Sequence, residues 1–190
     1  MLNSQEFPRI KSGQRGATAV EFGIIAVVFF TIFFGIIEFG RFFYLYNTVQ
    51  EVTRCAARAA AVTWRDSDRW DDTKSDSIQQ QCLFGHDVLV AGWEIHADNV
   101  LLRALNLDYV KVADDDPSSV GNNISNCSIG PTASNCIRFV EASIQSCDDE
   151  GENCQPISYQ PMFGLMIPVS GVGIPNSTVR MPAESLGYGG

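Results

Sequence analysis

An uninterrupted apolar stretch near the N-terminus limits what this chain can fold into. Its most apolar part runs from Phe22 to Ile37, sixteen uncharged residues that include only two glycines and one threonine. A helix from Ala17 to Ile37 would be about 30 Å long at ~1.5 Å per residue, enough to cross the hydrocarbon core of a bilayer. The residues that follow include an arginine and two tyrosines, which suit a membrane interface. We therefore expect a long helix over residues 17–63, of which about 17–44 spans a membrane.

A short polar leader precedes the apolar stretch. Residues 1–16 contain three basic residues against one acid, and two glycines and a proline disfavour a helix there. An ordinary secretory signal places a small-x-small cleavage site after its apolar core. Here no such site follows the apolar stretch. The sequence therefore predicts a leader on the cytoplasmic side, followed by a membrane helix.

Glu21 does not fit a plain membrane anchor. It lies four residues into the apolar run that begins at Ala17, where an ionised carboxylate is costly without a partner. A cut between Gly16 and Ala17 would create an α-ammonium group close to this carboxylate. The amine could then neutralise Glu21 of its own chain or of a neighbour. Alternatively, Glu21 stays near the cytosolic headgroups, where its cost is small.

Residues 15–22 form a motif that resembles a known processing site. Their sequence, R-G-A-T-A-V-E-F, is similar to the site at which prepilin peptidase cuts type IV pilins. Gly16 then lies at position −1 and Glu21 at position +5. The resemblance implies cleavage after Gly16 and a role for Glu21 in assembly.

The continuation of the helix resembles TadE-like proteins, which are minor pseudopilins of the tight-adherence pilus system. Residues 35–62 read G-I-I-E-F-G-R-F-F-Y-L-Y-N-T-V-Q-E-V-T-R-C-A-A-R-A-A-A-V. The family has a glutamate, an aromatic stretch and a spaced pair of arginines before a small-residue run. The matching residues here are Glu38, Arg54 and Arg58. The resemblance is strong over residues 15–62 and diffuse afterwards.

This resemblance implies a function in the assembly of a type IVb pilus. The implied partners are prepilin peptidase, other pilins and pseudopilins, the assembly platform of the inner membrane and the lipid bilayer. We expect the N-terminus in the bacterial cytoplasm and residues 64–190 in the periplasm, with incorporation into a pilus as a further option. The alternative is an unprocessed, single-pass binding module of a secretion or surface complex. In that case, the resemblance to a processing site is a coincidence.

The spacing of small and apolar residues predicts one continuous seam along the helix beyond the membrane. The seam members recur at intervals of four and three residues, as one face of a helix requires. They are Leu45, Val49, Val52, Ala56, Ala59 and Thr63. We expect the seam to pack on the protein's own head, with packing between subunits as the alternative. Arg54 and Arg58 lie off the seam, either solvated or facing the acidic domain. Glu38 would pair with a partner in an assembly or reach the far membrane interface.

The charge and the cysteines of the C-terminal part restrict its environment. Residues 65–190 hold eighteen acids and seven bases, a formal charge of −11. This excludes nucleic-acid binding by phosphate neutralisation, which needs a basic surface. Five of the six cysteines lie in this part and none forms a Cys-x-x-Cys motif. A compartment in which disulfides persist is therefore expected.

The cysteine positions suggest a disulfide scheme. One pair brackets the acidic tip DDEGEN, a second encloses a short loop, and a third could tie the long helix to the next one. The three pairs are Cys147–Cys154, Cys127–Cys136 and Cys55–Cys82. Six cysteines allow fifteen pairings, so the other pairings stay open.

The expected fold class is α+β, a long transmembrane helix followed by a small antiparallel β-rich domain with short helices and disulfides. Propensity and turn residues place helical segments first and strands later. Helical segments are expected at 75–84, capped by Asp72 or Ser75, and at 99–106. Strands are expected at 107–112, 136–145, 155–159 and 177–181, and a long loop at 113–135.

The sequence contains no catalytic signature. In the stretch PVSGVG, Pro168 stands where a nucleophile elbow needs glycine, so Ser170 is expected to be structural. A phosphate-binding glycine loop is not found either. These observations predict a protein that is not an enzyme and has no cofactor.

Metal binding is also not expected. His86 and His96 are the only histidines. Two acidic runs could attract calcium, but neither matches the twelve-residue calcium loop. The runs are Asp114–Asp116 and the group of Asp148, Glu150 and Glu152. Solvated turns are the preferred interpretation.

Overall fold

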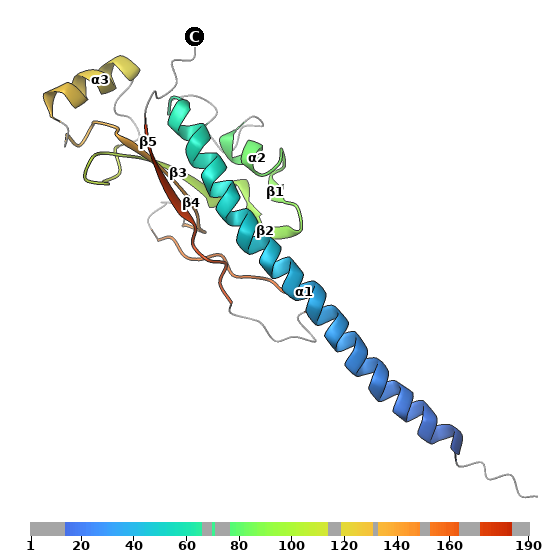
Figure 1. Ribbon diagram of the computed structural model, residues 1–190. Coiled ribbons are helices and arrows are strands. Elements are labelled where there is room, and N and C mark those ends of the chain that lie inside the picture. Colours follow the sequence, from blue (N-terminus) through green and yellow to red (C-terminus); the bar gives the residue numbers. More distant parts are fainter. Residues whose placement is uncertain are drawn as a thin grey trace, which may run out of the picture.

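One long helix forms the axis of the protein, and a small head is built around its C-terminal half (Figure 1). The computed structural model describes residues 14–65, 70, 77–113, 119–130, 133–148, 153–163 and 172–183. The elements combine helices with short antiparallel sheets. The α+β class expected from the sequence is confirmed.

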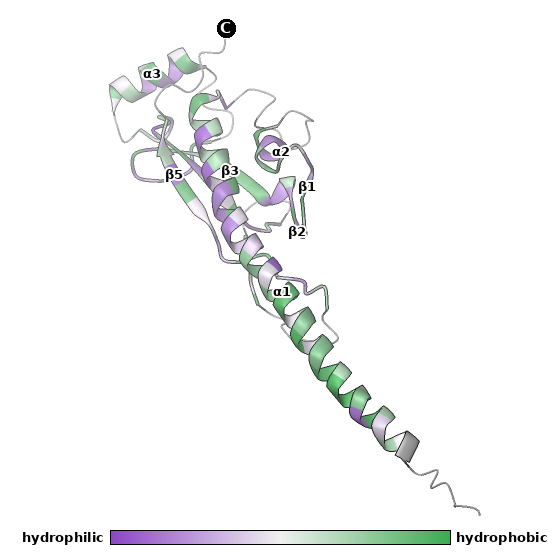
Figure 2. Cartoon of the chain, turned by 45° about the vertical axis from the view of Figure 1, so that its right-hand side comes forward, coloured by the Kyte–Doolittle hydropathy of each residue, from purple (hydrophilic) through white to green (hydrophobic). Residues whose placement is uncertain are grey.

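Helix α1 runs from Gln14 to Val62 over 49 residues without a break. Its N-terminal half is apolar and projects away from the head (Figure 2). The large apolar side chains of this half, such as Phe22 and Phe33, are exposed. Within the described chain, α1 is the one helix long and apolar enough to cross a membrane. Gly16 lies inside the first turn, so the expectation that the glycines of the leader prevent a helix is wrong at this position.

The C-terminal half of α1 presents the predicted seam to the head. Leu45, Val49, Val52 and Ala56 are fully buried, while Ala59 is half-buried. Its buried members belong to the hydrophobic core of the head. Small alanine side chains allow the sheet to approach the helix closely. The head is therefore organised around α1.

A three-stranded antiparallel sheet covers one side of this half of α1. It consists of β3 (Val100–Leu105), β4 (Phe139–Ile144) and β5 (Thr178–Pro182), in the order β3-β4-β5. Val140 and Ala142 of the central strand are buried in the core shared with α1. Alternate residues point away from the helix, because successive side chains of a strand face opposite sides.

A smaller group of elements lies on the other side of α1 (Figures 1 and 2). It comprises α2 (Ile78–Cys82), β1 (Val88–Leu89), β2 (Gly92–His96) and the 3-10 helix η2 (Ala97–Asn99). Gly92 allows β2 to approach α1, since a Cβ atom there would lie 2.4 Å from Cδ2 of Leu45.

Three disulfides connect the elements, and they are the three pairs predicted from the sequence. Cys55–Cys82 ties α1 to α2, and Cys127–Cys136 ties α3 (Val120–Ile129) to the segment before β4. Cys147–Cys154 closes the acidic tip after β4. Residues 149–152 of that tip lie outside the described residues.

The expectations for 99–106 and 107–112 are wrong. Val100–Leu105 forms strand β3 rather than a helix, because all six residues pair with β4. Residues 107–112 form a turn with a single bridge, Leu105 to Lys111, instead of a strand. In this turn, Asn106 Oδ1 accepts hydrogen bonds from the backbone N–H groups of Asp108 and Val110.

The long loop expected over 113–135 is also wrong, because it contains helix α3. Ser119 caps this helix by accepting from the N–H of Asn122 at 3.2 Å. Asn123 fixes it to the head, with Oδ1 accepting from the N–H of Ile137 at 2.8 Å. Residues 114–118 lie outside the described residues.

The remaining boundaries differ in part from those expected. Helix α2 is shorter than 75–84 and its cap is Ser77, whereas Asp72 and Ser75 lie outside the described residues. Segment 155–159 forms two isolated bridges, from Gln155 to Ser146 and from Ser158 to Gly173, instead of a strand. The partners of β4 are β3 and β5, so β4 does not form the expected hairpin with 155–159. Strands at 136–145 and 177–181 are confirmed as β4 and β5.

Candidate functional site

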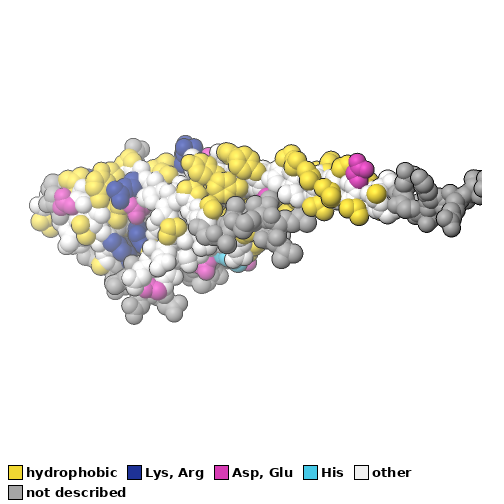
Figure 3. Space-filling model, turned by 90° about the horizontal axis from the view of Figure 1, so that it is seen from below, with side chains coloured by type: hydrophobic (Ala, Val, Ile, Leu, Met, Phe, Trp, Pro, Cys, Tyr) yellow, Lys and Arg dark blue, Asp and Glu magenta, His cyan; other side chains and the backbone are white. Residues whose placement is uncertain are grey.

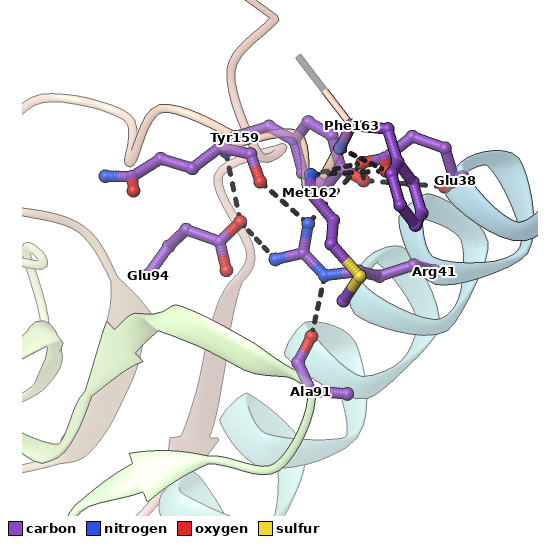
Figure 4. A network of polar contacts seen from close by, with 8 residues as sticks. Glu38, Arg41, Ala91, Glu94, Tyr159, Met162 and Phe163 are labelled. Atoms are coloured by element: carbon purple, nitrogen blue, oxygen red, sulfur yellow. Dashed lines mark hydrogen bonds and ion pairs between the residues drawn. The ribbon is translucent and has the colours of Figure 1, made fainter. Parts of the chain in front are cut away.

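A cluster of buried charges lies where α1 enters the head. Glu38 and Arg41 face the head on adjacent turns of α1, and their exposed fractions are 4% and 8%. Glu94 of β2 is buried beside them. Buried charges are rare unless they are paired and hydrogen-bonded. This junction between the helix and the head is therefore the candidate functional site (Figure 4).

Glu38 receives its hydrogen bonds from the segment that follows the acidic tip. Oε1 accepts from the hydroxyl of Tyr159, and both carboxylate oxygens lie 3.2 Å from the backbone nitrogen of Met162. The N–H of Phe163 donates to Oε2 at 3.4 Å. The ring of Phe163 also stacks on Phe34, with centroids 4.6 Å apart. Glu38 thus holds the chain around residues 159–163 against α1.

Arg41 connects α1 to two other segments of the head. Its Nη2 donates to Oε1 of Glu94 at 2.5 Å. Nε donates to the carbonyl of Ala91 at 2.9 Å, and Nη1 donates to the carbonyl of Gln160 at 2.7 Å. The guanidinium lies 3.7 Å from the ring centre of Trp93, a cation–π distance. One side chain thereby links α1, the β1–β2 hairpin and the segment around residue 160.

The two carboxylates of the junction share one guanidinium. Arg41 Nη1 lies 3.6 Å from Oε1 of Glu38, in addition to its bond with Glu94. Oε1 of Glu94 also accepts from the N–H of Gln160 at 3.0 Å. Oε2 of Glu94 is buried without a hydrogen-bond partner among the described residues. The junction therefore has one more negative than positive charge when both glutamates are ionised.

The environment of Tyr159 changes its acidity. Burial, first, and the hydrogen bond to Glu38, second, raise the pKa of its phenol from 10.0 to about 12, and the charge of Arg41 partly opposes them. The phenol therefore remains protonated and donates to Glu38 over the whole physiological range. Its role is to satisfy a buried carboxylate.

The predicted processing residues lie far along α1 from this junction. Gly16, Ala17 and Glu21 are all exposed near the start of the helix. A Cβ atom added to Gly16 would meet nothing within 4 Å. Glu21 has no hydrogen bond or ion pair to the described part of the chain. The exposed position of these three residues leaves them accessible to another protein.

Arg54 and Arg58 are exposed and do not take part in the junction. Arg54 forms an ion pair with Glu51 at 3.8 Å, on side chains that are more than half exposed. Such pairs contribute little to stability. Both arginines thus occupy a solvated face of α1.

The partners of Glu38 were missed from the sequence. Glu38 does not need an assembly partner or the far membrane interface to satisfy its charge, because Arg41 and Tyr159 of the same chain contact it. Helical spacing contained a usable signal, since Glu38, Arg41 and Leu45 extend the buried seam by steps of three and four residues. Tyr159 had no local signal.

A metal site is not formed by the described residues, in which no three His, Cys, Asp or Glu side chains gather as ligands. Asp114–Asp116, Glu150 and Glu152 lie outside the described residues. His86 and His96 are exposed. The described polar groups of the junction serve to hold segments together.

These features fit a membrane-anchored protein, in which α1, the one helix of the described chain long and apolar enough to cross a membrane, carries a disulfide-bonded head. The model of the TadE-like protein family matches residues 16–58, from Gly16 past the junction and Arg54 to Arg58. The resemblance found in residues 15–62 is confirmed by this match, which relates the chain to TadE-like pilus proteins. No curated protein and no solved structure matches the chain significantly.

Proposed function

We propose that this protein is a minor pseudopilin that acts in the assembly of a tight-adherence pilus. The observation that carries the proposal is the TadE-like match over the exposed apolar half of α1 and its continuation into the head. In this proposal, prepilin peptidase removes residues 1–16. The mature helix stays in the inner membrane until it joins other pilins or pseudopilins at the assembly platform.

The proposed mechanism is helix packing with charge neutralisation. Outside a membrane, the exposed apolar half of α1 needs other apolar helices to cover it. Cleavage after Gly16 would place the new amine at Ala17, about one helical turn from Glu21. In an assembly, the carboxylate of Glu21 would neutralise this amine or that of a neighbour.

The proposed orientation places the head outside the cytoplasm. Three disulfides support it, because disulfides persist in the periplasm and are rare in the cytosol. The proposed role is structural rather than enzymatic, in keeping with the TadE-like match.

The mass of the mature chain tests the processing step. Full-length protein is expressed in cells with and without an active prepilin peptidase, and its N-terminus is read by intact-mass measurement and N-terminal sequencing. We expect Ala17 as the first residue only when the peptidase is active, and Gly16→Val should block the cut. Recovery of chains that begin at Met1 from cells with active peptidase would sink the proposal and favour the unprocessed binding module.

The assembly step is tested with Glu21→Ala. This variant should be processed normally but should assemble few or no pili, because the amine would lack its carboxylate. Glu51→Ala removes an exposed acid of the same helix and is the matched control. Normal piliation by Glu21→Ala would contradict the charge-neutralisation mechanism.

A further inference from the structure

The sheet face that points away from α1 carries an open basic pocket. One row across the three strands places Arg103, Glu141 and Arg180 side by side in register. The turn after β3 forms the wall of the pocket. The pocket has a volume of about 320 Å³ and is lined by Arg103, Leu105, Tyr109, Lys111, Glu141 and Arg180.

The charge of this pocket is opposite to that of the head. Three cationic side chains surround one carboxylate, whereas residues 65–190 have a formal charge of −11. Figure 3 shows basic side chains gathered around an acidic one on the head. Glu141, which is 7% exposed, lies 2.6 Å from Nε of Arg180 and 3.8 Å from Nη1 of Arg103. Its single negative charge is outnumbered by the guanidinium groups of Arg103 and Arg180 alone.

Arg180 has hydrogen-bond donors available to a ligand. Among the described residues, its hydrogen bonding is limited to the one from Nε to Glu141. The side chain is 49% exposed, and its guanidinium lies 5.0 Å from the ring centre of Tyr109. The two terminal nitrogens can therefore donate in parallel to a carboxylate, the bidentate geometry that arginine favours.

The pocket wall is held in place before any ligand binds. Tyr109 has a positive φ of 60°. The residues before and after it donate their backbone N–H groups to Asn106 Oδ1, and these hydrogen bonds stabilise the turn. The ring of Tyr109 packs on Phe139, with centroids 5.0 Å apart. A preformed wall lowers the entropy lost on binding.

We propose that this pocket binds a carboxylate side chain from the head of a second copy of this chain. The pocket volume suits one or two side chains. Asp87, before β1, and Asp98, in η2, are exposed acids. They belong to the smaller group of elements, whose members α2, β1 and β2 lie on the opposite side of α1 from β5 (Figures 1 and 2). Surfaces of opposite charge on opposite flanks form a head-to-tail contact between copies, the kind that propagates along an assembly. The inference rests on the proposed function, for which it names a partner.

Self-association of the full chain in detergent tests this contact. Sedimentation is measured on protein made without prepilin peptidase, so the result does not depend on processing. The wild type should self-associate, and added salt should weaken the complex. Arg180→Gln should raise the dissociation constant ~10-fold or more, as expected for the loss of a charge-assisted hydrogen bond. Arg54→Gln, which removes an exposed arginine outside the pocket, should leave it unchanged.

Two further variants distinguish a lost contact between copies from a failure of Arg180→Gln to fold. Arg103→Gln removes the second guanidinium of the pocket, keeps the bond between Arg180 and Glu141, and should also weaken association. The double variant Asp87→Asn/Asp98→Asn removes the docking acids and should have the same effect with an intact pocket. Circular dichroism checks that each variant is folded.

Several outcomes overturn the proposal. A monomeric wild type, or folded pocket variants that associate like the wild type, would remove its basis. If Asp87→Asn/Asp98→Asn associates with the same dissociation constant as the wild type, these two acids are not the ones that dock in the pocket. Citrate serves as a small carboxylate probe. If citrate binds the pocket without dissociating the complex, the occupant is a free carboxylate and not a second copy.

Discussion

At the scale of single residues, Glu38 shows how a carboxylate is accommodated inside this protein. A buried charge is tolerated when hydrogen bonds replace its hydration. Glu38 receives them from Tyr159 and from two backbone N–H groups, and Arg41 lies 3.6 Å away. The partners come from a segment more than a hundred residues later in the chain. The interaction therefore stabilises tertiary structure and not the helix alone.

Removing the phenol hydroxyl should destabilise the head. In Tyr159→Phe, Glu38 loses one of its donors while the aromatic packing on Phe42 is kept. Leaving a buried acceptor under-satisfied costs about 1–3 kcal/mol, which denaturant unfolding of the full chain in detergent would measure. Tyr46→Phe is the control, since Tyr46 is 41% exposed. Equal unfolding midpoints for Tyr159→Phe and the wild type would argue against this role of the hydroxyl.

The acidity of Tyr159 predicts how stability depends on alkaline pH. Because its pKa is raised from 10.0 to about 12, the folded state holds the phenol proton more tightly than the unfolded state. Its contribution to stability is complete below pH 10.0 and is lost as the pH rises towards about 12. The difference between the phenolate absorbance titrations of wild type and Tyr159→Phe reports this group. A difference curve centred at the ordinary tyrosine pKa would contradict the prediction.

At the scale of elements, the disulfide between α1 and α2 closes the longest of the three loops. Its cysteines are 27 residues apart, compared with 7 for Cys147–Cys154. In the chain-entropy description, the longer loop restricts the unfolded chain more strongly. The two disulfides are thus expected to differ in their contribution to stability.

Replacing both cysteines of each pair by alanine tests this difference. Cys55→Ala/Cys82→Ala should lower the free energy of unfolding by about 3–4 kcal/mol, and Cys147→Ala/Cys154→Ala by about 2 kcal/mol. Denaturant unfolding of the two double variants under the same conditions gives the comparison. A larger loss for the shorter loop would be the contrary result.

Local signals in the sequence were enough for some elements and not for others. The seam of α1, strand β4 and the cysteine pairs follow from spacing and composition over a few turns or a short loop. Strand β3 contains leucine, arginine and alanine, good helix formers, and is a strand because β4 supplies its hydrogen bonds. Helix α3 is rich in asparagine and serine, and it depends on Asn123 and the Cys127–Cys136 bond for its position. Distant partners decide both elements.

The candidate site also contains residues that could be recognised in the sequence and contacts that could not. The residues of the predicted processing site and Glu38 could be singled out from the sequence, because a charge in an apolar run is a local anomaly. The chain segments that contact Glu38 could not, since Glu94 and Tyr159 are brought to it only by the folded head. At the scale of the whole molecule, these contacts decide how the head sits on its helix.

Arg41 is expected to be the main link in that connection. In Arg41→Gln, two buried carboxylates lose the guanidinium they share, and breaking a buried ion pair typically costs about 3–5 kcal/mol. Hydrogen exchange of the full chain should show faster exchange in β2 and around residues 159–163, with little change in the sheet β3-β4-β5. Arg54→Gln provides the matched control. Unchanged exchange around residues 159–163 would show that Arg41 does not hold this connection.

The unbroken course of α1 from Gln14 to Val62 has a mechanical consequence. A helix advances by about 1.5 Å and turns by about 100° for each residue, so depth and rotation along its axis are coupled. The head contacts the helix through Arg41 and through the seam that follows it towards the C-terminus. The helix is unbroken between these contacts and its apolar half. A force applied to the head is therefore transmitted along the helix to the apolar half. Lifting or turning the head would withdraw or rotate the apolar half by the same amount.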